Sequence, residues 1–212
     1  MNNPQYMSGT GNNFLVSEYE NSKTDIEIIS IVADSLFDID GVIYVEKIDS
    51  LTVKMHYYNN DGSTAELCVN GIRCVAKYAL DNSIVDSNEV TVVAPIGNIK
   101  TNIKENTVSI EVSTPTYEKN KLLIDGLECI KSNIGNPHLL VEVENVDKFD
   151  LEKFVQKVYE TNEFKNGVNV EIFNMFDKKI INARVYERGV GETDACGSGA
   201  ICMFYYLYIT NQ

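Results

Sequence analysis

Apolar and polar residues alternate with a period of two along much of the chain. In the segment TVSIEVST, for example, Val108, Ile110 and Val112 are separated by polar residues. Such alternation is typical of strands that place one face on a core and the other toward solvent. The pattern predicts strands at residues 51–58, 89–95, 107–114, 139–146, 168–173 and 180–187.

Helical signals are fewer than strand signals. Many strands with occasional helices favour an α+β protein over a doubly wound fold, in which strands and helices alternate regularly. The predicted helices cover residues 25–35, 69–80, 151–159 and 197–209.

A short motif occurs twice and indicates an internal repeat. CVNGIRC at residues 68–74 and CGSGAIC at residues 196–202 both read Cys-x-x-Gly-x-x-Cys, at an offset of 128. A fainter echo joins Gly-Asn at residues 11–12 to Gly-Asn at residues 135–136. Two related halves are the economical explanation. We expect one half at residues 1–117 and the other at 118–212, separated near the polar, proline-containing segment 114–121.

The first cysteine of each repeat lies between a polar turn and a glycine-containing helix start. There Cys68 and Cys196 are expected to meet free backbone N–H groups and the positive end of the helix dipole. These groups favour the thiolate, so we expect a thiol pKa below the ordinary value of about 8.5. The same N–H groups form a candidate site for a substrate carboxylate. They belong to Val69, Asn70, Gly197 and Ser198.

Two equivalent activated thiols are suited to a stereoinverting proton transfer. Such a reaction needs a base on one face of a carbon and an acid on the other, which one thiolate and one thiol provide in either direction. The α-carbon of an amino acid is a very weak acid. Its deprotonation therefore requires stabilisation of the charge on the α-carboxylate, which two helix N-termini aimed at it would supply.

The remaining cysteines are interpreted as core residues. Cys74 and Cys202 lie six positions into their helices, and Cys129 falls outside the repeat. Free cysteine is among the most often buried residue types. No Cys-x-x-Cys pair is present and the five-residue gap suits no usual zinc site, so no metal site is expected.

Composition restricts the class of protein further. The 212 residues are 44% hydrophobic and 23% charged, which is the profile of a globular chain. The net charge of −13 would repel phosphate backbones, so nucleic-acid binding is not expected. The longest apolar runs, such as residues 200–209, are shorter than the ~20 residues of a membrane span, and no signal pattern begins the chain. We expect no membrane association and a cytoplasmic location.

Five ordered motifs together resemble diaminopimelate epimerases, a family of cofactor-independent racemases with two catalytic cysteines. These motifs are GTGNNF, NNDGSTAELCVNGIRC, IGNPH, NGVNVE and VYERGVGETDACGSGA, and the likeness extends from about Gly9 to Ala200. The resemblance implies an α+β fold of two pseudo-symmetric halves, each a mixed or antiparallel sheet wrapped around a central helix, with the active site between them. It also implies interconversion of LL- and meso-2,6-diaminopimelate without pyridoxal phosphate or any other cofactor, in lysine and peptidoglycan-precursor biosynthesis.

The resemblance assigns roles to individual residues. Cys68 and Cys196 match the two acid/base cysteines. Residues that match the surroundings of the reacting amino and carboxylate groups are Asn12, His138 and Glu187. Residues that match the polar set around the distal end of the substrate are Asn59, Asn136, Asn169 and Arg188.

Several positions depart from the family pattern. Val69 replaces a glycine, Gly41 replaces a polar residue, and Asn13 replaces an aspartate. At an offset of 128, the counterparts of residues 89–118 would be residues 217–246, whereas the sequence ends at Gln212. We therefore expect the second half to lack its C-terminal strands, and the incomplete sheet to favour a homodimer. The alternatives are a racemase of another amino acid and a non-catalytic binding protein of the same fold.

Overall fold

The computed structural model describes residues 2–64, 68–177 and 180–210. The chain folds into two compact units, Met1–Val112 and Ser113–Gln212. The segment 114–121, which the sequence suggested as the link between the halves, contains strand β8 (Thr116–Tyr117), which pairs with β10 (Leu127–Asn133) of the second unit.

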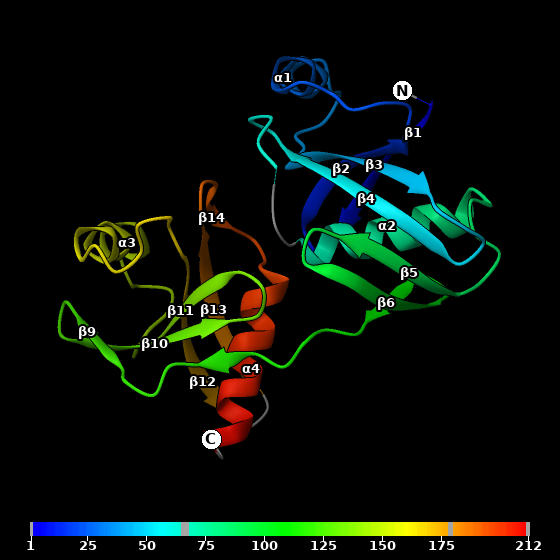
Figure 1. The fold of residues 1–212 in the computed structure, drawn as a ribbon. Helices are drawn as coiled ribbons and strands as arrows, with labels where there is room; N and C mark the ends of the chain where they lie inside the picture. Colours follow the sequence, from blue (N-terminus) through cyan, green and yellow to red (C-terminus); the bar gives the residue numbers. More distant parts are fainter. Residues whose placement is uncertain (1, 65–67, 178–179, 211–212) are drawn as a thin grey trace. The chain divides into compact units, whose positions relative to one another are not determined.

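The first unit is a seven-stranded sheet curved around one helix (Figure 1). Its strands follow one another in chain order, β2 pairs with β3 and β4 with β5 in parallel, and the other neighbours are antiparallel. Helix α2 (Val69–Asp81) packs against all seven strands, and α1 (Asp25–Ala33) packs near β3. The strands are β1 (Asn2–Gly9), β2 (Asn12–Glu18), β3 (Gly41–Lys47), β4 (Thr52–Asn59), β5 (Glu89–Ala94), β6 (Gly97–Lys104) and β7 (Thr107–Ile110).

Alternate residues of β2 and β3 enter two different cores. Phe14 and Ile43 pack with α2, whereas Leu15 and Val42 pack on the opposite side with Ile28 of α1. Successive side chains of a strand point to opposite faces, so a strand with a helix on each face is apolar at every position. The first unit thus buries α2 on one face of its central strands and α1 on the other.

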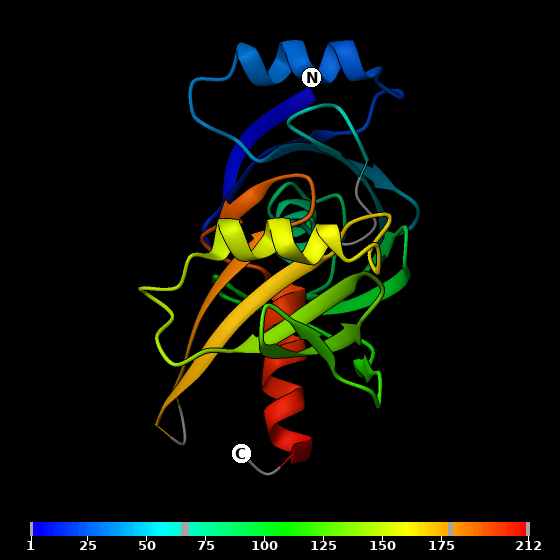
Figure 2. The same cartoon turned by 90° about the vertical axis from the view of Figure 1, so that its left-hand side faces the viewer.

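The second unit is also a sheet with helices on both faces. Figure 2 shows α3 (Leu151–Glu160, yellow) in front of the strands and α4 (Gly197–Thr210, red) behind them. The strand order is β14-β13-β12-β11-β10-β8, β9 pairs with β10, and only β11 and β12 among these described pairs run parallel. The strands not yet placed are β9 (Leu122–Ile124), β11 (Pro137–Glu142), β12 (Asn169–Asp177), β13 (Ile180–Glu187) and β14 (Gly191–Thr193).

The strand register of the second unit repeats that of the first. In the first unit, β2 pairs with β3 at Phe14 and Gly41, and in the second β11 pairs with β12 at His138 and Asn169. Val42 pairs with Tyr58, and the same pair 128 residues later is Val170 with Tyr186. The two units therefore share the core of one architecture, and the expected α+β class with pseudo-symmetric halves is confirmed.

The four predicted helices are all present. They begin and end within two residues of the predicted bounds, because each has a clear start signal. Thr24 and Glu27 form a capping box at α1, and the Asp150 side chain accepts the backbone N–H of Lys153 at α3. Among the described residues, no helix is both long enough and apolar enough to span a membrane.

Candidate active site

Cys68 caps the N-terminus of α2 with its thiol. Its Sγ accepts the backbone N–H of Gly71 at 3.3 Å, and its carbonyl accepts the N–H of Ile72 at 2.9 Å. A Cβ on Gly71 would lie 2.9 Å from Cε of Met55 and 3.1 Å from this sulfur, so the small residue lets the thiol settle over the helix end. The Cys68 side chain is partly exposed and belongs to the rim of the α2 core.

Two of the expected binding residues of the first unit meet beside this cysteine. Nδ2 of Asn70 donates to Oδ1 of Asn12 at 2.7 Å, and Arg73 donates to Oδ1 of Asn70 at 2.8 Å. Asp40 extends the network, because its Oδ2 accepts the backbone N–H of Asn13 at 2.7 Å and Nδ2 of Asn12 at 3.4 Å. Asp40 was not singled out from the sequence. Its position directly before Gly41 was the available signal.

Asn59 and Val69 have different surroundings. Asn59 lies at the end of β4, where its Nδ2 donates to Oγ of Ser63 at 2.9 Å. Val69 is the first residue of α2 and its side chain is buried. The substitution at Gly41 has a steric explanation, because a Cβ there would overlap the carbonyl oxygen of Tyr58 and the ring of Tyr57.

Cys196 stands before α4 in the same way. Its Sγ accepts the N–H of Gly199 at 3.4 Å and its carbonyl accepts the N–H of Ala200 at 2.9 Å. The two cysteines of the repeat thus make the same contact with the residue three positions later. They differ in exposure, because Cys196 is only 7% exposed.

A chain of buried polar side chains leads away from Cys196. Its Sγ lies 3.4 Å from Oγ of Ser198, which in turn accepts Nδ2 of Asn136 at 3.5 Å. Oδ1 of Asn136 is 2.9 Å from Nε2 of His138, and Nδ1 of His138 is 2.7 Å from Oε1 of Glu171. All five residues are buried. Three of the residues expected at the site are therefore joined to the cysteine by hydrogen bonds.

Glu171 was missed from the sequence although it lies in the quoted segment NGVNVE. It is completely buried, and its Oε2 has no hydrogen-bond partner among the described residues. A Cβ on Gly199 would overlap the Glu171 carboxylate, so the glycine of the second motif makes room for this group. An acidic residue inside an otherwise apolar strand was the signal that could have identified it.

The expected lowering of the thiol pKa is wrong for Cys196. Burial raises the pKa of this thiol well above its ordinary range, and the negative charges of Glu171 and Glu187 raise it further. The hydrogen bonds from Ser198 and Gly199 favour the thiolate, but they are outweighed. The helix N-terminus lies beside Cys196 as expected, but burial and the nearby negative charges determine the direction of the pKa shift.

The other expected residues of the second unit lie at the ends of β12 and β13. Oδ1 of Asn169 accepts the backbone N–H of Arg188 at 2.9 Å, and Oε1 of Glu187 accepts the Thr193 hydroxyl at 2.6 Å. The Arg188 side chain lies over Gly167, where a Cβ would come within 2.7 Å of its Cγ. Gly197 is the first residue of α4 and is partly exposed.

The three remaining cysteines are core residues, as predicted. Cys74, Cys129 and Cys202 are at most 4% exposed. Burial raises the pKa of Cys74 to about 12, and it raises the pKa of both Cys129 and Cys202 to about 11. Their thiols are held protonated near neutral pH and are unsuited to act as bases.

One group of side chains in the described part of the chain has the spacing of a metal site. Ligand atoms of His138, Glu171 and Cys196 all lie within 4.8 Å of one another. Both ring nitrogens of His138 already make hydrogen bonds, to Glu171 and Asn136. A metal would have to displace at least one of these contacts before the imidazole could bind it.

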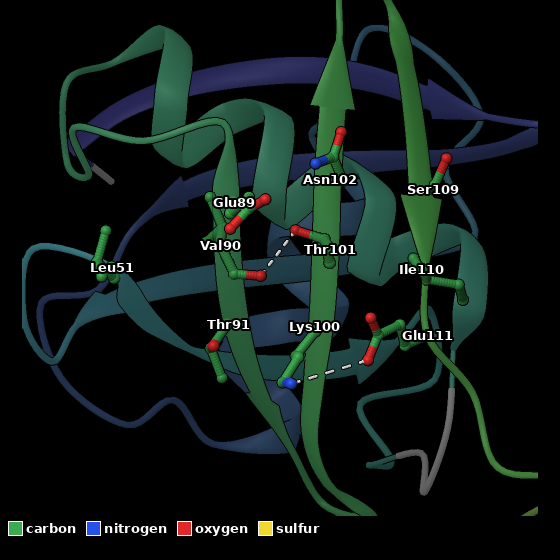
Figure 3. Close-up of a pocket in the computed structure, with 10 residues that line it drawn as sticks. All are labelled: Leu51, Glu89, Val90, Thr91, Lys100, Thr101, Asn102, Ser109, Ile110 and Glu111. Carbon is green, nitrogen blue, oxygen red and sulfur yellow. Dashed lines mark hydrogen bonds and ion pairs between the residues drawn. The ribbon is translucent and has the colours of Figure 1, made fainter.

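A pocket of about 440 Å³ lies elsewhere on the first unit (Figure 3). Its lining comes mainly from β5, β6 and β7 and includes Thr91, Lys100 and Glu111. Thr101 donates to the carbonyl of Val90 at 2.8 Å, and Lys100 lies 4.0 Å from Glu111. The lining contains no cysteine, so this pocket is separate from the thiol chemistry.

Comparison with known proteins identifies the family. The family model described as diaminopimelate epimerase matches residues 5–119 and 130–212. A diaminopimelate epimerase of Thermotoga maritima is 34% identical over 200 residues, covering 93% of this chain and 81% of the relative. The Bacillus subtilis diaminopimelate epimerase is 30% identical over 222 residues, covering 92% and 78%.

Solved structures share the fold at low sequence identity. A hydroxyproline epimerase from Agrobacterium vitis has a TM-score of 0.73 at 12% identity, covering 98% of this chain and 77% of the other. A PhzF-family protein from Bacillus anthracis has a TM-score of 0.68 at 17% identity, covering 95% and 78%. Together with the capped cysteines of the two units, the family match shows that this chain belongs to the diaminopimelate epimerase family.

Proposed function

We propose that this chain is an isomerase that interconverts LL- and meso-2,6-diaminopimelate, in lysine and peptidoglycan-precursor biosynthesis. Cys68 and Cys196 act on the same α-carbon. One, as thiolate, removes the α-proton from one face, and the other, as thiol, donates a proton to the opposite face. The two sulfurs exchange protonation states in each turnover, so the reverse reaction uses the same groups in opposite roles.

The observation that carries this proposal is the matched capping of the two thiols. Each sulfur accepts the backbone N–H of the third residue after it, at 3.3 Å for Cys68 and 3.4 Å for Cys196. A thiolate at either position keeps that hydrogen bond. A two-base mechanism requires that each sulfur can serve as base in one direction, and the shared contact supports this.

The backbone of the two helix ends supplies a second element of the mechanism. The first amides of a helix have no partner within the helix, and the helix dipole is positive there. We propose that Val69 and Asn70 at α2, with Gly197 and Ser198 at α4, direct their N–H groups to the substrate α-carboxylate. Negative charge that develops on it during deprotonation is stabilised by these donors.

The remaining roles concern substrate binding. Asn12, His138 and Glu187 are assigned to the reacting amino and carboxylate groups. Asn59, Asn136, Asn169 and Arg188 are assigned to the distal end, which in diaminopimelate carries a second ammonium and a second carboxylate. A guanidinium with several amides matches that chemistry.

Exchange of the α-proton with solvent tests the reaction directly. Reduced protein in heavy water, with LL- or meso-diaminopimelate, should incorporate deuterium at the α-carbon by proton NMR. Cys68→Ala and Cys196→Ala should each abolish interconversion, while Cys129→Ala serves as the matched control and should retain it. Interconversion that survives the loss of either capped cysteine would overturn the two-base assignment.

Replacement of Arg188 tests the choice of substrate. Arg188→Gln should raise KM for diaminopimelate by roughly 10- to 100-fold, the usual worth of a hydrogen bond to a charged group. Arg184→Gln is the control, because Arg184 is held by Glu192 and by backbone carbonyls and has no assigned substrate contact. An unchanged KM in Arg188→Gln would favour a racemase of a simpler amino acid.

We also propose a homodimer in a reducing, cytoplasmic compartment. Phe204, Tyr208 and Ile209 of α4 are 65%, 69% and 47% exposed, and such large apolar groups on one helix favour association. Catalytic thiols must stay reduced, which supports a cytoplasmic location. Light scattering should give a dimer mass, and Phe204→Lys should reduce it to that of a monomer. A monomeric unmodified chain would contradict the dimer.

A further inference from the structure

The two cysteine sites are built on equivalent strands but have different neighbours. The register that pairs Phe14 with Gly41 in the first unit pairs His138 with Asn169 in the second. Two residues beyond Gly41 on β3 lies Ile43, and two residues beyond Asn169 on β12 lies Glu171. The face toward α2 is therefore apolar at the two positions where the face toward α4 carries a histidine and a glutamate.

The glycine of each motif shows that these positions approach the helix that carries the cysteine. A Cβ on Gly71 would come within 3.1 Å of Cδ1 of Ile43, and a Cβ on Gly199 would overlap the Glu171 carboxylate. Glu171 thus occupies in the second unit the place that an isoleucine side chain occupies in the first. The difference brings an acidic group to within 4.8 Å of the Cys196 sulfur.

The hydrogen bonds specify how this acidic group is held. Nδ1 of His138 faces Oε1 of Glu171 at 2.7 Å, and Nε2 faces Oδ1 of Asn136 at 2.9 Å. Both ring nitrogens of His138 therefore face oxygen atoms of neighbouring side chains. Both side chains of the His138–Glu171 pair are completely buried, so the glutamate carboxyl group has a fixed place beside the imidazole.

We propose that Glu171, held by His138, is a positioning residue that keeps Cys196 in the thiol form before substrate binds. A second negative charge beside the Glu171 carboxylate is unfavourable in this buried setting, so Cys196 retains its proton. The catalytic meaning of this inference rests on the proposed function, because it makes the two cysteines unequal in the substrate-free enzyme. In the direction in which Cys196 donates a proton, this cysteine is therefore ready before substrate binds.

Other groups around Cys196 act in both directions. Glu187 on β13 also disfavours the thiolate, whereas Ser198 and the Gly199 N–H favour it. Asp194 precedes the cysteine in the chain and is exposed. Among these groups Glu171 is the one that has an apolar counterpart in the first unit and no substrate contact assigned to it.

The test measures ionisation of Cys196 without substrate. Reduced protein is treated with iodoacetamide from pH 6 to 11, and the modification rate of each cysteine is measured by peptide mass spectrometry. Only the thiolate reacts, and access to the sulfur is common to all points of one curve, so the midpoint reports ionisation. In the protein without substitutions, the midpoint of the Cys196 rate curve should lie well above about pH 8.5, the pKa of a free thiol.

Three variants distinguish a charge effect from a structural one. Glu171→Gln keeps the shape and a hydrogen-bonding oxygen but removes the charge, and should lower the Cys196 midpoint by about one to two pH units. Glu171→Asp keeps the charge and should stay near the unmodified value. Glu142→Gln changes an exposed glutamate of β11 and should have no effect.

The outcomes are decisive in either direction. A Cys196 midpoint at or below about pH 8.5 in the protein without substitutions would overturn the inference. This measurement does not depend on the folding of any variant. An unshifted midpoint in folded Glu171→Gln would overturn it as well. Because no substrate is used, failure here leaves the deuterium-exchange test of the proposed function independent, and failure of that test leaves the alkylation result standing.

Discussion

Replacement of the buried pair by its counterparts from the first unit gives a sharp test of the internal repeat. His138→Phe with Glu171→Ile would install at β11 and β12 the two residue types that Phe14 and Ile43 supply on the equivalent strands. In the first unit these two side chains are at most 1% exposed and belong to the core around α2. The double variant therefore removes both members of the buried pair and introduces the apolar residue types that the first unit buries at the equivalent positions.

The expected magnitudes follow from burial. His138 and Glu171 are both 0% exposed along their side chains, so either single change leaves a buried polar group without its partner. Such a loss costs about 3–5 kcal/mol of the free energy of unfolding, whereas replacing both partners of a buried pair by apolar residues is neutral or stabilising by about 1–4 kcal/mol. The double variant should accordingly be more stable than either single variant, and inactive because the polar chain to Cys196 is lost.

Urea denaturation followed by far-ultraviolet circular dichroism measures these differences, with stability obtained by linear extrapolation. Glu192→Gln serves as the control, because it breaks an exposed ion pair. The side chains of Arg184 and Glu192 are 30% and 43% exposed. This substitution should cost no more than about 1 kcal/mol. If the losses of the two single variants simply add in the double variant, His138 and Glu171 are not energetically coupled, which would contradict the expected pairing.

Two further changes probe packing and protonation. Gly199→Ala should lower the free energy of unfolding by about 1–3 kcal/mol, because the new Cβ overlaps the Glu171 carboxylate, which is fixed by a hydrogen bond. Gly71→Ala should lower it less, because the flexible end of the Met55 side chain can move away. Equal losses in thermal unfolding would refute the proposed crowding by Glu171. Burial raises the pKa of Cys129 to about 11, so the folded protein holds this proton more tightly than the unfolded chain does. The stabilisation that results is fully present below about pH 8.5 and is lost as the pH rises toward 11. Cys129→Ala should flatten the alkaline decline of unfolding free energy by up to about 1.4 kcal/mol per pH unit, and an unchanged slope would contradict a buried thiol at this position.

The helices were well predicted, but several central strands were not. Segments such as β2 and β3 carry consecutive buried residues, because α1 covers one face and α2 the other. A strand buried on both faces has no alternation to detect. The strands found by alternation, such as β4 and β5, bury alternate positions over part of their length.

The sequence pointed to candidate site residues in both units. The repeat drew attention to Cys68 and Cys196, and in the structure Asn12 is hydrogen-bonded to Asn70 and Asn136 to His138. Glu171 escaped notice because it lies 33 residues from His138 in the chain, and the parallel pairing of β11 with β12 creates the contact.

The starts of the helices, the cysteines that cap them and the family of the chain can all be recognised from the order of the residues. These features depend on local hydrogen bonding and on ordered motifs, both of which are written in neighbouring residues. The direction of the pKa shift of Cys196, in contrast, comes from the tertiary structure. The pKa of this thiol is raised by burial and by the charge of Glu171 on β12, and both effects depend on distances that only the folded chain fixes.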